Sequence, residues 1–276
     1  MGNTIKIALV QQKCHNKKDV NRQKGLDAVK SAARQGAQII CFAELGFEPF
    51  YPQQPATEAL LKRAETIPGP TTEMFSDLAA QLGVVIVLNL FERDGVRTYD
   101  TSPVINVDGR LLGKTRMIHI TDYPCFHEQD YYHPGDQGAP VYETPFGNIG
   151  VAICYDRHYP EYMRALALAG AQIVFIPQAG AVDEWPEGLY EAEMRVAAFQ
   201  NGYFTALCNR IGPESRLTFA GESFICNPAG KVIARAGKGT EEIVLCNLDL
   251  NQVEKSHARR LFFRDRRPAL YRDWLV

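Results

Sequence analysis

Short runs of β-branched and other apolar residues alternate with amphipathic stretches along the first two thirds of this chain, and this alternation limits the possible folds more than any other feature. The runs are too short for buried helices, so we predict strands over residues 5–11, 37–44, 83–91, 150–154 and 171–177. The amphipathic stretches predict helices over residues 19–35, 72–82, 160–170 and 189–201. Strands that alternate with helices indicate an α/β fold.

Turn residues between strand-like flanks predict three hairpins, at residues 107–110, 145–148 and 227–231. Because hairpins are antiparallel, they argue against a simple doubly wound sheet. We therefore expect two mixed sheets packed face to face with helices outside, which is a four-layer αββα sandwich. No linker or repeat divides the chain, so we predict a single domain over residues 1–276. Residues 250–276 turn basic and aromatic, as expected of a C-terminal arm at a subunit interface.

The charge balance and the apolar runs exclude several classes of partner. Thirty Lys and Arg residues against 32 Asp and Glu residues leave a net charge of −2, without the basic stripe that nucleic acid requires. Apolar runs such as residues 84–88 are far shorter than the roughly 18 residues of a membrane helix. The chain shows no signal peptide, and its seven cysteines are an odd number without a Cys-x-x-Cys pair. We therefore expect reduced thiols and a cytoplasmic protein.

Two apolar strands end in side chains that are suited to catalysis. Cys154 follows a buried run and precedes Pro160, a favourable first residue of a helix, so it lies at a strand-to-helix junction that faces a crevice. Glu44 ends an apolar strand, where burial would raise its pKa towards that of a general base. Each residue also has a plainer interpretation, Cys154 as a core thiol and Glu44 as a strand-end carboxylate that faces water.

The segment 112–136 is rich in histidine, cysteine and charged residues. Cys125, His127 and His133 invite a zinc site, but their spacing matches no standard one and no fourth ligand is evident. No glycine-rich phosphate-binding loop follows a strand. These residues therefore predict neither a metal site nor a nucleotide cofactor.

The segments together resemble the nitrilase superfamily of carbon–nitrogen hydrolases over nearly the whole chain. Residues 42–45 (Phe-Ala-Glu-Leu) match the family's glutamate motif, residues 126–136 its second glutamate motif, and residues 153–160 (Ile-Cys-Tyr-Asp-Arg-His-Tyr-Pro) its cysteine motif. Residues 170–177 and 193–201 are also similar to the family. Because three motifs match in order, we favour functional roles for their central residues over the plainer interpretations.

The resemblance implies an αββα sandwich that dimerises, with a glutamate–lysine–cysteine triad. Glu44 would take the thiol proton, Cys154 would attack an amide or ureido carbonyl, and water activated by Glu44 would hydrolyse the acyl-thioester. Glu128 would orient the triad or the substrate amine, while the lysine and the backbone N–H after the cysteine would hold the oxyanion. The resemblance implies no metal or organic cofactor. The implied partners are a small amide or ureido substrate and a second copy of the chain.

The chain departs from the family at the catalytic lysine. The family motif reads Gly-Lys-x-Arg-Lys-x-His, whereas residues 113–119 read Gly-Lys-Thr-Arg-Met-Ile-His, so Met117 occupies the lysine position. Lys114 does not take its place, because side chains alternate between the faces of a strand and residue 114 faces away from residue 117. Methionine fills the space of a lysine without its charge, so we predict an inactive or slow enzyme. Because the other catalytic residues remain, we favour a Lys-to-Met substitution introduced to trap a ligand over a natural pseudoenzyme.

Within the family, the cysteine motif is most similar to N-carbamoyl-amino-acid and β-ureidopropionate amidohydrolases. Arg157 is the candidate clamp for a substrate carboxylate, with Tyr155 as a second substrate-binding residue. The alternative is a surface Arg157 paired with Asp156 or Glu161. The putrescine-type branch has Trp and Gln in place of Tyr155 and Arg157, which disfavours a cationic substrate. Residues 179–186 are expected to form a loop over the site.

Two other functions stay open. A non-catalytic member of the fold would bind a small metabolite or a protein through the same pocket, with Met117 as its natural residue. An acyltransferase would use the same cysteine but pass the acyl group to an amine in place of water.

Overall fold

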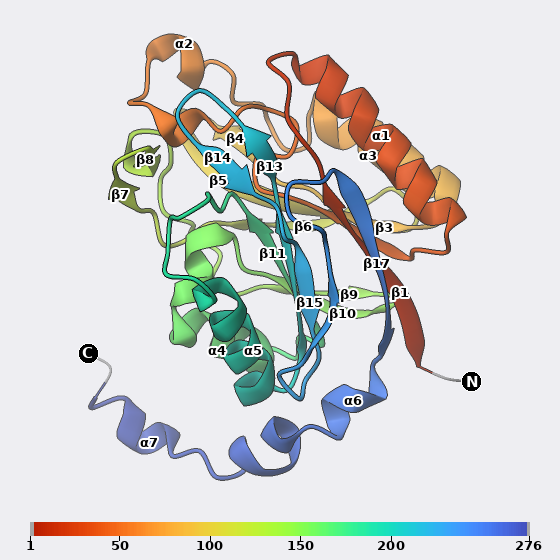
Figure 1. Ribbon diagram of the computed structural model, residues 1–276. Coiled ribbons are helices and arrows are strands. Elements are labelled where there is room, and N and C mark those ends of the chain that lie inside the picture. The colour runs from red at the N-terminus through yellow and green to blue at the C-terminus, as the bar shows by residue number, and fades with distance from the viewer. Residues whose placement is uncertain (1–2, 275–276) are drawn as a thin grey trace.

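Two β-sheets lie face to face in the computed structural model, which describes residues 3–274, and helices cover both outer surfaces (Figure 1). Helices α1 (Lys18–Arg34) and α3 (Pro70–Leu82) cover the first sheet. Helices α4 (Pro160–Leu168) and α5 (Leu189–Asn201) cover the second. The predicted αββα sandwich is therefore confirmed. The first two and last two residues of the predicted domain and arm, 1–2 and 275–276, lie outside the described residues.

The first sheet has seven strands in the order β17-β1-β2-β3-β5-β4, with β6 paired to β5. Its parallel strands are β1 (Thr4–Gln11), β2 (Ile39–Phe42) and β3 (Val85–Val87). Its antiparallel strands are β4 (Leu90–Asp94), β5 (Arg97–Ile105), β6 (Leu111–Arg116) and β17 (Glu242–Asp249). The sheet thus mixes a parallel centre with antiparallel edges.

The second sheet has six strands in the order β16-β15-β12-β11-β10-β9. Its parallel strands are β10 (Gly147–Val151), β11 (Ile173–Gln178) and β12 (Phe204–Asn209). Its antiparallel strands are β9 (Val141–Thr144), β15 (Phe224–Cys226) and β16 (Val232–Arg235). The predicted hairpins are confirmed as β5–β6, β9–β10 and β15–β16.

Small elements complete the chain. Two short two-stranded pairs are β7 (Asp122–Tyr123) with β8 (Phe126–His127), and β13 (Ile211–Pro213) with β14 (Thr218–Ala220). The short helices are α2 (Glu58–Leu61), α6 (Asn251–Glu254) and α7 (Pro268–Tyr271). After β17 the chain runs below the sandwich through α6 and α7 (Figure 1). None of the helices between residues 3 and 274 has the length and apolar character needed to cross a bilayer.

The core divides into layers because side chains alternate along each strand. On β1, Ile7 and Leu9 join the cluster between the two sheets, whereas Ala8 and Val10 join the cluster under α1 and α3. On β11, the apolar side chains likewise divide between the inter-sheet cluster and the cluster under α4 and α5. Both faces of these central strands are therefore buried, which explains their continuous apolar sequences.

The predicted strands 83–91, 37–44 and 150–154 differ from the structure in ways that bear on the site. The run 83–91 is divided into β3 and β4 at Asn89, whose buried side chain accepts from the Leu45 amide (2.7 Å) and donates to Asp100 (2.5 Å). The run 37–44 stops at Phe42, so Glu44 lies in the turn after β2. The run 150–154 also stops early, at Val151, and Cys154 has a left-handed φ of 43° that a strand does not accommodate.

Candidate active site

The structure brings three predicted site residues together from separate segments. Glu44 follows β2, Glu128 follows β8, and Cys154 begins the 3-10 helix Cys154–His158 after β10. One carboxylate oxygen of each glutamate and the Cys154 Sγ all lie within 4.8 Å of one another. All three side chains are buried. Strands of both sheets therefore deliver an acid–base group and a thiol to the same point.

Backbone geometry positions the thiol. Cys154 adopts a positive φ, a conformation that costs a non-glycine residue about 1–3 kcal/mol and is found at active sites where the surroundings enforce it. Gln178, at the end of β11, donates to the Cys154 Sγ at 3.3 Å. Arg157 Nη1 donates to the Cys154 carbonyl at 2.8 Å. The thiol is thus held from two sides at the junction that the sequence predicted.

A buried arginine positions the turn that carries Glu44. Arg210 Nη1 donates to the carbonyls of Glu44 and Leu45, both at 2.9 Å, and its Nη2 donates to the Glu48 carbonyl at 2.8 Å. Sequence reasoning missed Arg210, because this arginine follows a strand about 165 residues away and no local pattern links it to the turn.

The carboxyl groups of the site are buried without a counter-charge. Neither Oε atom of Glu44 has a hydrogen-bond partner among the described residues, and the same holds for Glu128 Oε1. Burial, reinforced by the charge of Glu128, raises the pKa of Glu44 to about 8. Burial and the charge of Asp100 raise the pKa of Glu128 well above its usual range. At neutral pH the Glu44 carboxyl group therefore holds its proton, unlike that of an ordinary glutamate.

A third carboxyl group, Asp100 on β5, belongs to the same environment and was not predicted. Its Oδ2 atom is buried without a hydrogen-bond partner in the described chain. Burial and the charge of Glu44 raise its pKa. Burial and the charges of Glu44 and Glu128 also raise the pKa of the Cys154 thiol. The site thus disfavours every negative charge that a thiolate mechanism requires.

Met117 lies directly after β6 and is buried in the inter-sheet cluster that includes Cys154. Its amide donates to the Asp100 carbonyl at 2.9 Å, and its carbonyl accepts from the Gly135 amide at 2.8 Å. Lys114 and Arg116 both bind Glu92 on the opposite face of β6. The prediction that Lys114 faces away from the lysine position is therefore confirmed. That position holds an uncharged side chain.

Arg157 is buried, with 4% of its surface exposed, so the alternative of a surface arginine is wrong. Besides the Cys154 carbonyl it binds Gln178 Oε1 at 3.0 Å, and its Nε lies 3.3 Å from Glu193 Oε2. Its guanidinium also stacks 4.5 Å from the centre of the Tyr190 ring. Asp156 pairs instead with His119 at 2.7 Å. Arg157 therefore braces the cysteine loop from a buried position between β11 and α5.

Tyr155 is half-buried and contacts aromatic neighbours of its own segment. Its ring packs edge-on against His158 and Tyr159, at centroid distances of 5.0 and 5.8 Å. Cys125, His127 and His133 do not assemble into a group of ligand atoms within residues 3–274, and His127 instead pairs with Asp122 at 3.2 Å.

The loop 179–186 is tied to the site through Glu184, which sequence reasoning did not single out. Glu184 accepts hydrogen bonds from the Tyr123 and Tyr190 hydroxyls, at 2.6 and 2.5 Å, and from the Ala181 amide at 2.8 Å. Its charge is close enough to Cys154 to contribute to the raised pKa of the thiol. The loop therefore places a carboxylate near enough to the predicted nucleophile to act on it electrostatically.

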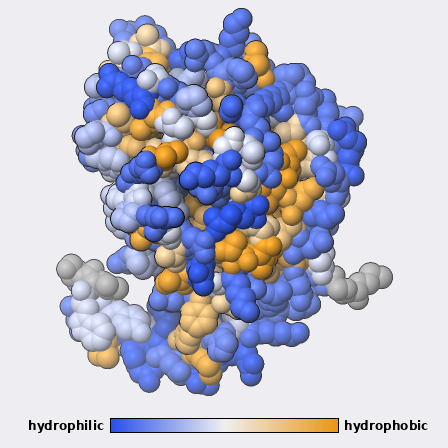
Figure 2. Space-filling model, viewed as in Figure 1, coloured by the Kyte–Doolittle hydropathy of each residue, from blue (hydrophilic) through white to orange (hydrophobic). Residues whose placement is uncertain are grey.

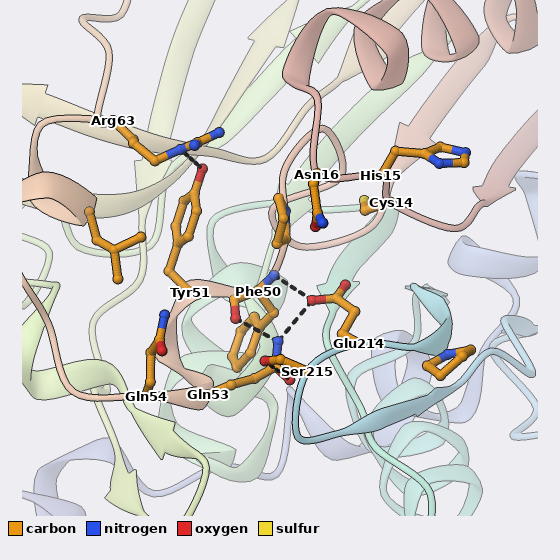
Figure 3. Close-up of a pocket in the computed structure, with 13 residues that line it drawn as sticks. Cys14, His15, Asn16, Phe50, Tyr51, Gln53, Gln54, Arg63, Glu214 and Ser215 are labelled. Atoms are coloured by element: carbon orange, nitrogen blue, oxygen red, sulfur yellow. Dashed lines mark hydrogen bonds between the residues drawn. The ribbon is translucent and has the colours of Figure 1, made fainter.

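A prominent hollow of the described surface lies elsewhere. It has a volume of about 600 Å³ and is lined by residues that include Cys14, Tyr51 and Arg63. Figure 3 shows Glu214 accepting hydrogen bonds from the Phe50 amide (2.9 Å) and from Gln53 (2.8 Å) at its wall. Its lining includes neither Glu44 nor Cys154, and several of its polar groups are bonded to one another. Its size alone therefore does not make it the reaction site.

Comparisons with known proteins agree with the predicted resemblance. The sequence profile named carbon-nitrogen hydrolase matches residues 6–258. The chain is 36% identical to an N-carbamoylputrescine amidase of Solanum lycopersicum, over 99% of this chain and 95% of that protein. It is 38% identical to a β-ureidopropionase of Arabidopsis thaliana, over 67% of this chain and 46% of that protein. A solved carbon-nitrogen hydrolase from Helicobacter pylori G27 superposes with a TM-score of 0.92 at 27% identity, over 99% of both chains.

Proposed function

The chain belongs to the carbon–nitrogen hydrolase family, and on that premise we propose that it is a cysteine-dependent amidohydrolase that cleaves a non-peptide C–N bond of a small amide or ureido compound. The observation that carries the proposal is the buried convergence of Glu44, Glu128 and Cys154 within 4.8 Å. A thiol beside a carboxyl group is the arrangement that nucleophilic catalysis requires.

The reaction proceeds through a thioester. Glu44 takes the Cys154 proton, the sulfur bonds to the substrate carbonyl carbon, and the C–N bond breaks as the amine leaves with the proton returned by Glu44. Water then attacks the thioester, gives its proton to Glu44 and releases the acid product, while the sulfur regains a proton. The Tyr155 backbone N–H supports the oxyanion. Burial raises the pKa of both Glu44 and Cys154. Little Glu44 carboxylate and little Cys154 thiolate are therefore present at neutral pH.

We propose that Met117 slows turnover. The family's lysine would supply an oxyanion donor and a positive charge beside the thiol, and losing one such donor costs on the order of 10²–10³ in rate. Buried, unpaired oxygen atoms on Glu44 and Glu128 support this view, since they lack the cation that a lysine would bring. The residue that the parental gene encodes at position 117 distinguishes an introduced substitution from a natural one.

Two head groups are candidates for the substrate. An N-carbamoyl amino acid would present its carboxylate to Arg157, whose Nη2 atom has no hydrogen-bond partner in the described structure. A ureido compound that ends in an ammonium would instead face Glu184. The charge that Glu184 places near Cys154 favours this second candidate, as does the N-carbamoylputrescine amidase name of a relative.

The test measures turnover of the Met117→Lys form on carbamoyl amino acids, carbamoyl diamines, simple amides and nitriles. We expect hydrolysis of at least one ureido or amide class, and turnover of none would contradict the proposal. In the same form, Arg157→Ala lowers kcat/KM for carboxylate substrates selectively if Arg157 is the clamp. Glu184→Gln lowers kcat/KM selectively for ammonium substrates if Glu184 is the residue that binds the head group. Equal losses on both classes would show that neither residue recognises the head group.

We also propose a homodimer or larger homo-oligomer. Phe199 of α5 packs on Phe262 of the arm at 5.5 Å, yet both side chains stay partly exposed beside Leu261 and Val196. Figure 2 shows apolar side chains on the lower part of the molecule, where the end of α5 and the arm lie in Figure 1. Such a patch favours a covering subunit. Light scattering that gave a 30.9 kDa particle at micromolar concentration would contradict this.

A cytoplasmic location is part of the same proposal. All seven cysteines are unpaired in the structure, as in proteins of a reducing compartment.

A further inference from the structure

Arg157 is a buried side chain that uses only part of its hydrogen-bonding capacity. A guanidinium group has five N–H donors. The Arg157 Nη1 atom donates to the Cys154 carbonyl at 2.8 Å and to Gln178 Oε1 at 3.0 Å. Its Nε and Nη2 atoms have no hydrogen-bond partner among residues 3–274, although Nε lies 3.3 Å from Glu193 Oε2. Because buried donors are seldom left unused, this part of the guanidinium indicates a place where an acceptor binds.

The unused donors lie on one edge of the guanidinium group. The Nε hydrogen and one Nη2 hydrogen point in the same direction, and such an edge bonds both oxygens of a carboxylate side by side. Arg157 also borders a cavity of about 260 Å³ between helices α4 and α5, which neighbour each other in Figure 1. The lining of this cavity includes neither Cys154 nor Glu44, so the cavity is distinct from the candidate active site.

The side chains that line the cavity favour an anion. Arg157 and Arg164 bring two positive charges, and Glu193 is the one carboxylate among the described residues of the lining. Glu193 is engaged with His158, whose Nδ1 lies 2.5 Å from its Oε1. Asn201 is a second sign of a ligand, because its Oδ1 atom is buried without a hydrogen-bond partner in the described structure. A net positive charge and unused buried polar atoms therefore occur in the same cavity.

From this arrangement we propose that the cavity between α4 and α5 binds one small carboxylate anion, held by the free edge of Arg157 and by the charge of Arg164. Pockets for drug-sized ligands have volumes of about 300–1,000 Å³, so this cavity of about 260 Å³ suits an anion of a few carbon atoms. The proposal goes beyond the hydrolase activity, because no step of the thioester reaction uses the cavity. Arg157 is also a candidate clamp for the substrate, whereas Arg164 and Glu193 have no part in that reaction and separate the two roles.

A carboxylate in the cavity would act on Cys154 through Arg157. The Arg157 guanidinium holds the Cys154 carbonyl and Gln178, and Gln178 donates to the Cys154 Sγ at 3.3 Å. Burial raises the pKa of the Cys154 thiol, and the positive charge of Arg157 opposes this effect. A bound anion offsets that charge and leaves less thiolate. The cavity therefore lowers the reactivity of the nucleophile when a carboxylate occupies it.

The test is a titration of the full-length protein with acetate, followed by saturation-transfer NMR at constant ionic strength with chloride as the replaced anion. We expect saturable binding with a Kd of about 1 mM, the affinity that two charge-assisted hydrogen bonds supply. Arg164→Met should weaken binding by about 10-fold, because it removes a positive charge. Glu193→Gln should strengthen binding by about 10-fold, because it removes the carboxylate that competes for Arg157. Arg110→Met is the matched control, since Arg110 is an exposed arginine of the β5–β6 hairpin, and it should leave binding unchanged.

The alkylation rate of Cys154 provides a second measurement. Acetate should slow the reaction of Cys154 with iodoacetamide, as mapped on peptides, while the reaction of Cys246 on β17 stays unchanged. In Arg164→Met, the same slowing should require about 10-fold more acetate, as the weaker binding predicts.

Absence of saturable binding, or equal affinity in folded Arg164→Met and Glu193→Gln, would overturn the proposal. Loss of binding in folded Glu44→Gln would also overturn it, because acetate would then occupy the catalytic centre. Binding that weakens as protein concentration and particle mass rise would show that a carboxylate of a second copy fills the cavity, and this too would overturn the proposal. Binding is read without substrate. A hydrolase that binds no acetate and an acetate-binding protein without turnover are therefore distinguishable outcomes.

Discussion

Buried carboxyl groups lie towards both faces of strand β6, and the two sets differ in whether a cationic side chain pairs with them. Glu92, on one face, is bound by Lys114, by Arg116 through two hydrogen bonds of 2.9 and 2.8 Å, and by Thr101 at 2.6 Å. Glu44 and Glu128, towards the other face, form no ion pair through their carboxyl groups in the described structure. Burial alone would raise the pKa of Glu92, but its partners lower it below the usual range. Burial without partners raises that of Glu44 to about 8.

The difference depends on the parity of a strand. Residues 114 and 116 point to Glu92, and residues 115 and 117 point the other way, where Thr115 bonds to Tyr142 at 3.0 Å. The hypothesis that residue 117 occupies the lysine position predicts that a cation there would pair with Glu44 and Glu128 as Arg116 pairs with Glu92. The comparison teaches that burial does not by itself decide the state of a carboxyl group. The nearest side chain of opposite charge does.

The largest expected effect comes from removing the cation that Glu92 has. Arg116→Met should lower the free energy of unfolding by about 3–5 kcal/mol, because it leaves a buried charge without its main partner. Chemical denaturation measures the loss. The double variant Glu92→Gln/Arg116→Met is the control and should recover part of it. A change below about 1 kcal/mol in Arg116→Met would mean that Lys114 suffices for Glu92.

The second effect comes from supplying the cation that Glu44 lacks. Met117→Lys should raise kcat/KM for the preferred ureido or amide substrate by about 10²–10³, the worth of one oxyanion donor. Met117→Leu controls for packing and should give no gain. If the lysine variant is folded and shows no increase on any substrate class, the assignment of residue 117 to the lysine position is wrong.

The third effect is on the pH dependence of the free energy of unfolding, to which Glu44 and Glu92 contribute with opposite signs. Folded Glu44 keeps its proton until about pH 8, whereas in the unfolded chain it loses it near its ordinary value of 4.5. The folded protein therefore binds more protons in that window, and the free energy of unfolding should fall by a few kcal/mol, at most about 5, as the pH rises through it. Glu92, with a lowered pKa, contributes stability that is present above pH 4.5 and lost in more acidic solution.

Urea titrations from pH 4 to 9, with a chelator present, measure how the free energy of unfolding changes with pH. Met117→Lys should flatten the decline between pH 5 and 8, because an ammonium lowers the pKa of its carboxyl neighbours. Parallel curves for the two proteins would show that residue 117 does not contact the acid group.

The smallest effect is expected where an ion pair is exposed. Lys62 and Glu58 on α2 pair across one helical turn, with most of each side chain in solvent. Lys62→Met should change the free energy of unfolding by less than about 0.5 kcal/mol, since water screens such a pair. Thermal unfolding of this variant is compared with that of Arg116→Met. The difference between the two losses of stability measures how much more a buried cation stabilises the protein than an exposed one. Similar losses in both would remove the basis of the comparison.

Much of this protein was determined by local sequence. Short apolar runs, turn residues and the alternation of side chains predicted the layers, the three hairpins and the opposite orientations of Lys114 and Met117, because these depend on neighbours in the chain. The motifs around Glu44, Glu128 and Cys154 also stood out locally, each beside a strand end. Their proximity was implied by the resemblance, and the structure supplied the distances.

Tertiary structure alone decided what surrounds those residues. Asp100, Glu184 and Arg210 come from segments without a recognisable motif, and they reach the site only when the sheets pack together. Arg157, which the sequence allowed at the surface, is buried against Gln178 and Tyr190. The physical reason is that desolvation and charge act through space. A side chain's pKa and partners therefore depend on contacts between residues that are far apart in the sequence, which periodicity along a strand does not encode.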